Sequence, residues 1–257
     1  MMIDLHTHIL MGIDDSNFDK ESLLVALRNA EKEGVRKIFV TPHYVQFEVE
    51  NSTQIISEEM AKLQALIKQE NIDITLYIGA EIFVTLDLPM LLEQKKVPTL
   101  NHSRYILIEM PLGMVPRYMD LLIYQLCMKE YVPIIAHPER NVRIQKHPKY
   151  LQNFIEKGAL VQMNAGSIMG DFGGRAKTAA RLFLKHNMVH FIASDAHDAH
   201  HRPLKLLDAK NVVEKIMGKQ DASSLFEHNA AAVILNQYIQ TPDIKPIKRK
   251  WYSFGER

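Results

Sequence analysis

The chain opens with Met1-Met2-Ile3-Asp4-Leu5-His6-Thr7-His8, a short apolar run that leads directly into two histidines. In an extended strand, side chains two residues apart point to the same face, so His6 and His8 can reach one ion together. The pair alone is weak evidence, because 12 histidines in 257 residues would produce about half such a pair by chance. It gains meaning if other strands end in similar side chains.

Six further apolar, β-branched runs follow, and five of them end in potential metal ligands. The runs that end in ligands are 38–43, 74–81, 105–111, 132–140 and 189–197, and the run without a strong ligand is 160–164. Between the runs, hydrophobic residues recur at helical spacing, as at Leu23, Leu27 and Ala30. Strands that alternate with amphipathic helices indicate a parallel sheet, and at about 250 residues a single closed barrel is the economical arrangement. We therefore predict an α/β fold, a single seven-stranded β/α barrel similar to a TIM barrel.

In barrels of this kind the reactive side chains lie at the C-terminal ends of the strands. Several runs are stopped there by proline, at Pro42, Pro111 and Pro138. The candidate metal ligands at these ends are His6, His8, His43, Glu81, Glu109, His137, Asp195 and His197, and Asp15 in the loop after the first strand is a further candidate. Imidazole and carboxylate ligands without thiolate favour manganese, iron, zinc or magnesium over a structural zinc site. Such a set exceeds the needs of one ion and indicates a cluster of two or three.

Two arginines follow ligand-bearing strand ends in loops above the same rim. Arg140 comes three residues after His137, and Arg202 comes five residues after His197. A forked guanidinium binds phosphate oxygens bidentately, so we predict that both arginines contact a phosphate. Two metal ions bridged by a carboxylate generate hydroxide at neutral pH and hold the oxygens of a phosphoester. The residues therefore predict metal-assisted hydrolysis of a phosphoester.

A few residues near the predicted rim have two interpretations. Asp14 is either a turn residue or part of the site, and Glu139 is either a surface charge or part of the site. His200 and His201 follow the last strand and could touch the site, and Tyr44 either lines its mouth or packs in the core. The glycine-rich residues 170–175 lack the spacing of a phosphate-binding P-loop, so a simple turn is favoured over anion binding.

Composition limits the classes of partner. A formal net charge of +1 gives no reason to expect nucleic acid or an anionic membrane as the main partner. No apolar run approaches the ~20 residues of a membrane helix, and the first strand begins at the first methionine, so neither membrane insertion nor a signal peptide is expected. A single cysteine excludes an internal disulfide and suits the cytoplasm. We expect one domain over residues 1–240 and a basic tail over residues 241–257 with the only tryptophan.

Several short motifs, taken in order, form a specific set. They are Asp4-Leu5-His6-Thr7-His8, Asp14-Asp15, Thr41-Pro42-His43, Gly79-Ala80-Glu81, Glu109-Met110-Pro111, His137-Pro138-Glu139-Arg140, Asn164-Ala165-Gly166-Ser167 and Ser194-Asp195-Ala196-His197 with Arg202. The set resembles the polymerase-and-histidinol-phosphatase (PHP) superfamily and, within it, the manganese-dependent protein-tyrosine phosphatases of bacterial capsule and exopolysaccharide loci, the CpsB/YwqE type. The resemblance covers almost the whole chain. Ser16 and Tyr44 depart from the glycine and second histidine expected there, which concerns loop shape and substrate contacts.

The resemblance implies a distorted seven-stranded barrel, the PHP fold, that holds three divalent metal ions, manganese in the family. It implies one ion held by His6, His8, Glu81 and Asp195, a second held by Glu81, Glu109 and His137, and a third held by Asp15, His43 and His197. It also implies that Arg140 and Arg202 hold the phosphate. The family substrate is phosphotyrosine, notably on the tail of a membrane-associated bacterial tyrosine kinase that controls polysaccharide export.

We predict hydrolysis of protein phosphotyrosine, by in-line attack of a metal-bridging hydroxide on phosphorus. One alternative is a small-molecule phosphatase of the same superfamily that acts on histidinol phosphate or a nucleotide. The other is a non-enzymatic docking protein that binds a phosphorylated tail. Whether the chain forms an oligomer is left open.

Overall fold

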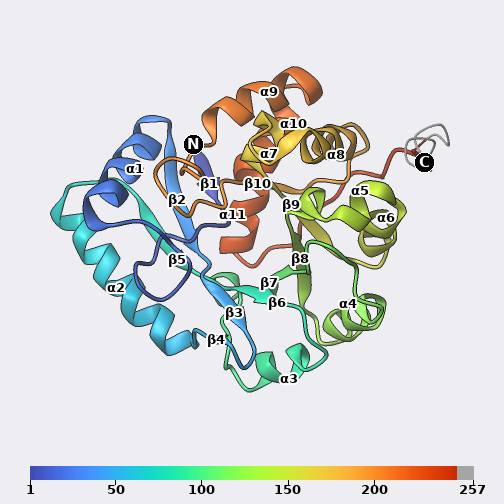
Figure 1. Ribbon diagram of the computed structural model, residues 1–257, viewed down its shortest axis with the longest axis horizontal. Coiled ribbons are helices and arrows are strands. Elements are labelled where there is room, and N and C mark those ends of the chain that lie inside the picture. The colour runs from blue at the N-terminus through green and yellow to red at the C-terminus, as the bar shows by residue number, and fades with distance from the viewer. Residues whose placement is uncertain (248–257) are drawn as a thin grey trace.

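The strands of the protein form the centre of the molecule and the helices surround them, as the computed structural model, which describes residues 1–247, shows in Figure 1. The strands are β1 (Met2–Asp4), β2 (Val35–Val40), β3 (His43–Val45), β4 (Val49–Glu50), β5 (Thr75–Ile78), β6 (Glu81–Phe83), β7 (Tyr105–Glu109), β8 (Val132–Ala136), β9 (Leu160–Asn164) and β10 (Phe191–Ala193). All seven predicted runs contain a strand, and two of them contain two. The predicted mixed α/β class is confirmed.

The helices and helical turns fill the connections between these strands. They are α1 (Lys20–Lys32), α2 (Thr53–Gln69), α3 (Leu88–Glu93), η1 (Leu100–His102), α4 (Met119–Met128), η2 (Pro138–Arg140), α5 (Val142–Lys146), α6 (Lys149–Glu156), α7 (Ala165–Met169), α8 (Gly173–Lys185), α9 (Leu207–Met217), α10 (Lys219–Ser223), η3 (Ser224–His228) and α11 (Asn229–Ile234). Local sequence sets where helices begin: Asp19 accepts a hydrogen bond from the backbone of Ser22 and caps α1, and Ser52 caps α2 in the same way. No helix within residues 1–247 is long and apolar enough to cross a membrane.

The strands pair in two sheets, where a single closed barrel was predicted. One sheet has the order β1-β2-β5, and the other has the order β10-β9-β8-β7-β6-β3-β4, with only β3 and β4 antiparallel. Two of the predicted runs cross from the first sheet to the second, one at Thr41-Pro42 and one at Gly79-Ala80. Proline has no N–H to donate to a ladder. Gly79 lies so close to its neighbours that a Cβ there would be 2.6 Å from Cδ2 of Leu100. These residues explain why the ladder is interrupted.

The ends of the first and last predicted runs meet in one isolated bridge between Thr7 and Ala196. The N–H of His8 donates to the carbonyl of Ala196 over 2.8 Å, and the N–H of Asp195 donates to the carbonyl of His6 over 2.9 Å. This short contact brings ligand candidates from the two halves of the sequence to one place.

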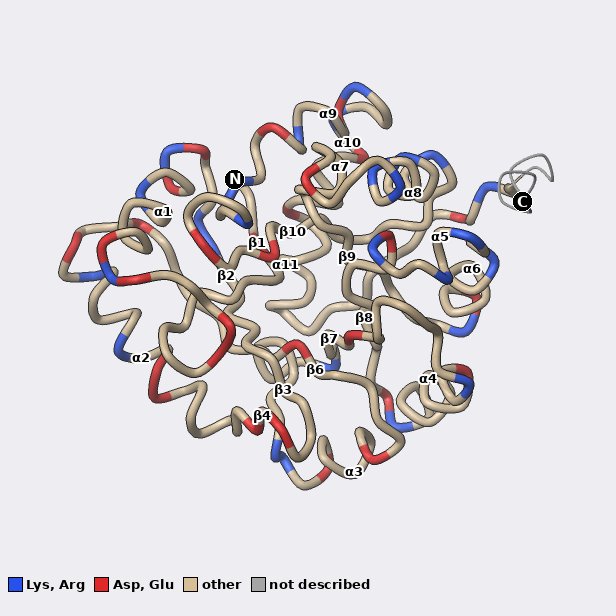
Figure 2. The backbone as a smooth tube through the Cα atoms, in the orientation of Figure 1, with Lys and Arg blue, Asp and Glu red and all other residues tan. Residues whose placement is uncertain are grey.

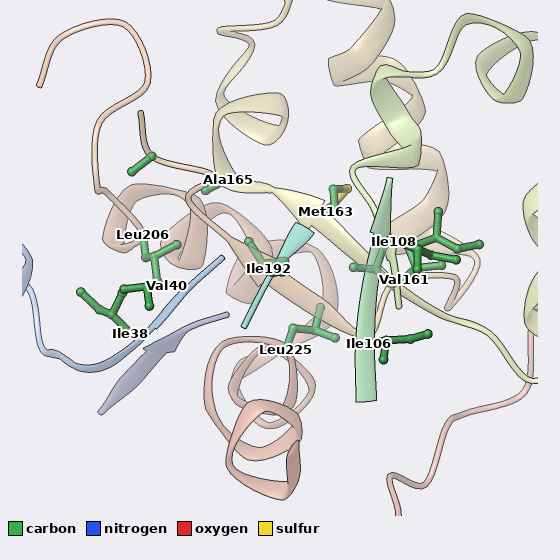
Figure 3. Packing of buried hydrophobic residues seen from close by; sticks show 14 of the residues in the cluster. Ile38, Val40, Ile106, Ile108, Val161, Met163, Ala165, Ile192, Leu206 and Leu225 are labelled. Carbon is green, nitrogen blue, oxygen red and sulfur yellow. The ribbon is translucent and has the colours of Figure 1, made fainter. Parts of the chain in front are cut away.

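Apolar side chains are buried on both faces of the strands. Along β7, Ile106 and Ile108 belong to a large cluster under the surrounding helices (Figure 3), while Tyr105 and Leu107 belong to a second cluster that contains residues of the other strands and of α11. Alternation with a period of two is expected for a strand that is covered on both faces. Figure 1 shows α11 near the middle of the molecule, where it packs against β1 and η1. The interior is thus a packed core on which the rim is supported.

The first part of the predicted tail, residues 241–247, lies against the end of α8. The N–H of Lys245 donates to the carbonyl of His186 over 3.0 Å, and the side chain of Asn187 donates to the carbonyl of Asp243 over 3.0 Å. Figure 2 shows that Lys and Arg gather over α5, α6 and α8 on this side of the molecule. The rest of the predicted tail, including Trp251, lies outside the described residues.

His190, just before β10, gives a prediction about acid stability. Its side chain is buried, and its Nδ1 accepts a hydrogen bond from the N–H of Val161 over 3.0 Å. Burial lowers the pKa of His190 from 6.5 to about 4. Below pH 6.5, His190 is therefore protonated in the unfolded chain but stays neutral in the folded chain. The free energy of unfolding falls by about 3 kcal/mol as the pH decreases from 6.5 to 4.

The His190→Asn variant should lose this part of the pH dependence, because asparagine does not titrate. Urea unfolding of the wild type and the variant between pH 6.5 and pH 4 measures the difference. The exposed His228, replaced by asparagine, serves as the control. Equal pH slopes in His190→Asn and the wild type would contradict the prediction.

Candidate metal centre

Four of the predicted ligands converge around the ends of β1, β5–β6 and β10. The Nε2 atoms of His6 and His8 lie 2.9 Å apart, and each is 3.2 Å from Oε2 of Glu81. Oδ1 of Asp195 lies 3.5 Å from the His6 nitrogen and 3.6 Å from the His8 nitrogen. These atoms are mutually close enough to share one ion. The geometry matches the first ligand set that the resemblance implies.

The other predicted ligands surround Glu81 on its open side. Glu81, Glu109 and His43 form a second group, with Nδ1 of His43 3.2 Å from Oε2 of Glu81 and 3.9 Å from Glu109. His137, which was expected in this group, lies at its edge, with Nε2 2.8 Å from Oε1 of Glu81 and 3.6 Å from Oε1 of Glu109. The carboxylate of Glu81 thus faces four histidines.

A third group contains Asp15, His43 and His197, as expected, and includes His8 as well. Oδ1 of Asp15 lies 3.2 Å from Nε2 of His197 and 3.7 Å from Nδ1 of His8. The side chain of Asp15 is about half exposed, whereas the histidines His8 and His197 are buried. The structure therefore brings all nine predicted ligands to one rim, with Asp15 at its solvent side.

Backbone conformation aims two of these side chains at the rim. His137 follows β8 with φ of +30°, and Asp195 follows β10 with φ of +55°. Residues other than glycine rarely adopt positive φ, and such strain is typical of functional sites. The strands end where these residues turn out of the extended conformation.

Several buried polar atoms in the centre have no hydrogen-bond partner, which fits a site for cations. They include Oδ1 of Asp195, Nδ1 of His43 and Nε2 of His197. Unpaired buried polar atoms are costly, and a cation bound by them would remove that cost. Histidine nitrogens and carboxylate oxygens are suitable donors for several divalent metals.

The charges of the centre are strongly coupled. Burial disfavours a charged His8, yet the carboxylates of Asp14 and Glu81 outweigh burial and raise the pKa of His8 to about 10. Burial also opposes ionisation of Asp195, but His6, His137 and Arg202 hold the pKa of its carboxyl well below the usual range. Burial and the neighbouring Glu81 raise the pKa of Glu109. The cavity stabilises positive charge, as a metal centre requires.

Asp14 contacts the ring nitrogen of His8 that points away from Glu81. Its Oδ2 lies 2.5 Å from Nδ1 of His8 and accepts a hydrogen bond from the N–H of His43 over 3.2 Å. This arrangement resolves the two interpretations of Asp14 in favour of a role in the site. A carboxylate that holds the second nitrogen of a histidine ligand fixes the orientation of the ring and increases its basicity.

The Asp14→Asn variant should bind metal about 10- to 100-fold more weakly, because the amide removes the charge behind His8 while it keeps the size of the side chain. Titration of metal-depleted protein with Mn²⁺ measures the change. Asp19→Asn, in the cap of α1, is the control. An unchanged affinity would show that Asp14 does not support a ligand.

The strand without a strong ligand, β9, supplies a hydrogen-bonded base for the centre. Oε1 of Gln162 lies 3.0 Å from Nδ1 of His6, and Nε2 of Gln162 donates to Oδ1 of Asn164. The amide of Asn164 then donates to Oδ2 of Asp195 over 2.6 Å. This role was not predicted from the sequence, although two polar residues in a buried strand were a usable signal.

Glu139 is buried, which rules out the surface charge considered above. Its Oε1 accepts hydrogen bonds from the N–H of Asn164 over 3.1 Å and from the hydroxyl of Ser167 over 2.6 Å. Burial raises the pKa of its carboxyl. Glu139 therefore fixes the end of β9 next to the ligands.

The two predicted phosphate-binding arginines meet at one carboxylate oxygen. Arg140 and Arg202 lie 3.1 and 2.5 Å from Oδ2 of Asp195. The ring of Phe172, from the glycine-rich loop, lies 4.4 Å from the guanidinium carbon of Arg140 and 5.9 Å from that of Arg202. Gly166 permits this packing, since a Cβ there would be 3.0 Å from the ring. The predicted turn thus carries an aromatic side chain that orients both arginines. This role was not predicted from the sequence.

The remaining candidates lie outside the ligand groups. His200 and His201 line a cavity of about 390 Å³ beside Arg202, and their N–H groups donate to Asp198. Tyr44 is buried in the large apolar cluster, so it packs in the core.

Cys127 should be irrelevant to catalysis. It lies in α4, burial raises the pKa of its thiol, and the position six residues later is Pro133 where a cysteine-dependent tyrosine phosphatase needs arginine. Cys127→Ser should keep kcat/KM within a few-fold of the wild type on an aryl phosphate. A loss of several orders of magnitude in a folded variant would contradict this expectation.

Fold and site together define the protein as an α/β protein with a cluster of histidine and carboxylate side chains able to hold metal ions, next to two arginines, at the ends of its strands. A family model described as "Capsular polysaccharide synthesis, CpsB/CapC" matches residues 2–235, and the chain belongs to this family.

Two relatives and one solved structure illustrate the match. The chain is 36% identical over 249 residues to the tyrosine-protein phosphatase YwqE of Bacillus subtilis, and this alignment covers 97% of this chain and 98% of that protein. It is 33% identical over 254 residues to the putative tyrosine-protein phosphatase CapC of Staphylococcus aureus, and this alignment covers 98% of this chain and 99% of that protein. A crystal structure from a study of YwqE from Bacillus subtilis and CpsB from Streptococcus pneumoniae, described as unique metal-dependent tyrosine phosphatases, aligns with a TM-score of 0.92 and 36% identity over 96% of this chain and 100% of that one.

Proposed function

We propose that this protein is a metal-dependent phosphatase that hydrolyses phosphotyrosine on proteins in the control of capsular or exopolysaccharide synthesis. The observation that carries the proposal is a group of four side chains beside two arginines. The four are His6, His8, Glu81 and Asp195. The full-length relatives named as tyrosine-protein phosphatases support the substrate class.

The proposed cofactors are three divalent ions, manganese in the first place, with iron, zinc or magnesium as alternatives. Their proposed ligands are His6, His8, Asp15, His43, Glu81, Glu109, His137, Asp195 and His197. Bound ions would supply a nucleophilic water of lowered pKa and would neutralise charge on the phosphate. The donor set supports this assignment, because it combines nitrogen and oxygen donors without a thiolate.

The chain's own groups then position the substrate. Arg140 and Arg202 are proposed to bind the equatorial phosphate oxygens, with Phe172 holding both guanidinium groups in place. Asn164 and Gln162 keep Asp195 and His6 oriented. The phenolate that leaves from phosphotyrosine has a pKa near 10 and departs more easily than a serine alkoxide. This difference supports a preference for phosphotyrosine without a dedicated general acid.

We infer that the seven strand runs form a distorted seven-stranded β/α barrel, supported by the bridge between Thr7 and Ala196. We further propose that the substrate is the tail of a membrane-associated tyrosine kinase and that the protein acts in the cytoplasm.

The test combines metal analysis with a panel of phosphoesters. The gently purified protein should contain more than one metal equivalent per chain, lose activity on chelation and regain it with Mn²⁺. It should hydrolyse phosphotyrosine peptides faster than phosphoserine peptides and histidinol phosphate. A preference for histidinol phosphate would favour the small-molecule phosphatase, and binding without turnover would favour the docking protein.

A further inference from the structure

A groove opens beside the candidate metal centre, between the loop 12–15 and the β3–β4 hairpin. Its volume is about 770 Å³, and Asp15, His43 and Glu109 form part of its wall. The rest of its lining is largely apolar and includes Ile13, Val45, Val49, Ile55 and Phe83. The groove is therefore continuous with the place where a phosphate would be hydrolysed.

Several apolar side chains in and beside the groove are exposed. Val49 and Ile55 are 37% and 40% exposed, and Phe47, in the turn of the hairpin between the groove residues Val45 and Val49, is 85% exposed. Phe47 also has φ of +68°, which is rare for a bulky residue. Exposed apolar side chains and backbone strain next to a site are typical of residues that contact a ligand or a partner protein.

The walls of the groove are fixed before any ligand binds. The side chain of Asn51 is buried and donates to two backbone carbonyls, that of Ile13 over 2.6 Å and that of His43 over 3.0 Å. These bonds tie the loop 12–15 to the hairpin. A preformed groove loses little entropy when it binds a ligand.

The hairpin also offers an edge for an extended chain. β4 is the last strand of its sheet and, among residues 1–247, pairs only with β3. An unpaired edge can accept a further strand through its backbone. Glu48 and Glu50 are exposed on this hairpin, so its charge disfavours an acidic ligand.

We propose that the groove binds the extended polypeptide segment that flanks the phosphotyrosine, and that it selects apolar over acidic flanking side chains. The inference rests on the protein phosphotyrosine phosphatase proposed above. Asp15, His43 and Glu109 line the groove and also belong to the candidate ligand groups, so a chain that lies in the groove can continue directly to the place where its phosphate would bind. A compact phosphomonoester would leave the groove unused.

The test compares two phosphotyrosine peptides of equal length, one with leucine and valine on both sides of the phosphotyrosine and one with aspartate there. The wild type should show at least a tenfold higher kcat/KM for the apolar peptide, as expected from burial of one or two apolar side chains. Phe47→Ala and Val49→Ser should each reduce the ratio of the two kcat/KM values to about one third of the wild-type ratio or less. Tyr238→Ala, at a side chain of equal exposure (84%), and Val25→Ser on α1 should keep the wild-type ratio.

The outcomes separate this inference from the proposed function. If the wild type hydrolyses both peptides equally, or if the Phe47 and Val49 variants keep the preference, the groove has no such role, although the phosphatase function stands. If the wild type hydrolyses neither peptide, the proposed function fails and this inference fails with it. Metal content and the circular dichroism spectrum of each variant show that the variants are folded.

Discussion

The Glu81→Gln variant is expected to lose activity by on the order of 10³-fold or more and to retain less metal than the wild type. The carboxylate of Glu81 lies within 3.2 Å of nitrogens of His6, His8, His43 and His137, so it is common to most of the ligand groups. Glutamine keeps the shape of the side chain but removes the charge that would bridge two bound ions. Loss of several kcal/mol of charge stabilisation corresponds to a rate effect of about this size.

Two measurements check this expectation on the same preparation. Elemental analysis gives the metal content per chain, and steady-state kinetics on an aryl phosphate gives kcat/KM. Glu93→Gln, at an exposed side chain that pairs with Lys129 on the outside of the molecule, is the matched control. If Glu81→Gln keeps both full metal content and full activity, Glu81 does not bridge ions.

The Arg140→Ala and Arg202→Ala variants are each expected to lose about 10²- to 10³-fold in kcat/KM while they keep bound metal. Removal of one charged donor to a phosphoryl group typically costs ~2–4 kcal/mol of transition-state stabilisation. Both guanidinium groups contact Oδ2 of Asp195 and the ring of Phe172. Their effects should therefore not be additive in the double variant, because each arginine changes the surroundings of the other.

Arg143→Ala is the control for this pair, because Arg143 lies on α5 and packs over Tyr150. The kcat/KM of Arg143→Ala should stay within a few-fold of the wild-type value. Wild-type kinetics in Arg140→Ala or Arg202→Ala would remove that residue from phosphate binding. A variant that loses its metal together with its activity would show that the arginine acts on the ligands through Asp195.

The positions of the ligand candidates could be predicted from sequence because two simple regularities coincide. Apolar runs specify buried parallel strands, and the residue that follows each run must lie at the common C-terminal edge. Asp195 follows β10 in this way, whereas His43 and Glu81 are separated from β2 and β5 by two residues each and are the first residues of β3 and β6. The three groups of ligand candidates differ in part from the predicted ligand sets. His137 lies at the edge of the second group, and His8 belongs to two groups.

Interruptions and supporting contacts were less predictable. Gly79 lies at the break between β5 and β6, and the close approach of Leu100 that leaves no room for a Cβ there is a contact that no local pattern reveals. The bonds of Gln162 to His6 and of Asn164 to Asp195 join residues more than 30 positions apart. The packing of Phe172 on the arginines depends on the path of an entire loop. Such contacts depend on tertiary geometry, whereas the strand pattern depends on neighbours in sequence.

The bridge between Thr7 and Ala196 also bears on the order in which the molecule folds. The N–H of Ser194 donates to Oδ1 of Asp4 over 3.0 Å next to this bridge, so the contact closes a loop of about 190 residues. Closure of so long a loop costs about 5 kcal/mol of chain entropy. A chain still emerging from the ribosome cannot assemble the ligands before residue 197 has been synthesised. Binding of an ion by the group of His6, His8, Glu81 and Asp195 would therefore come late in maturation, and the bound ion would hold the two ends of the sequence together.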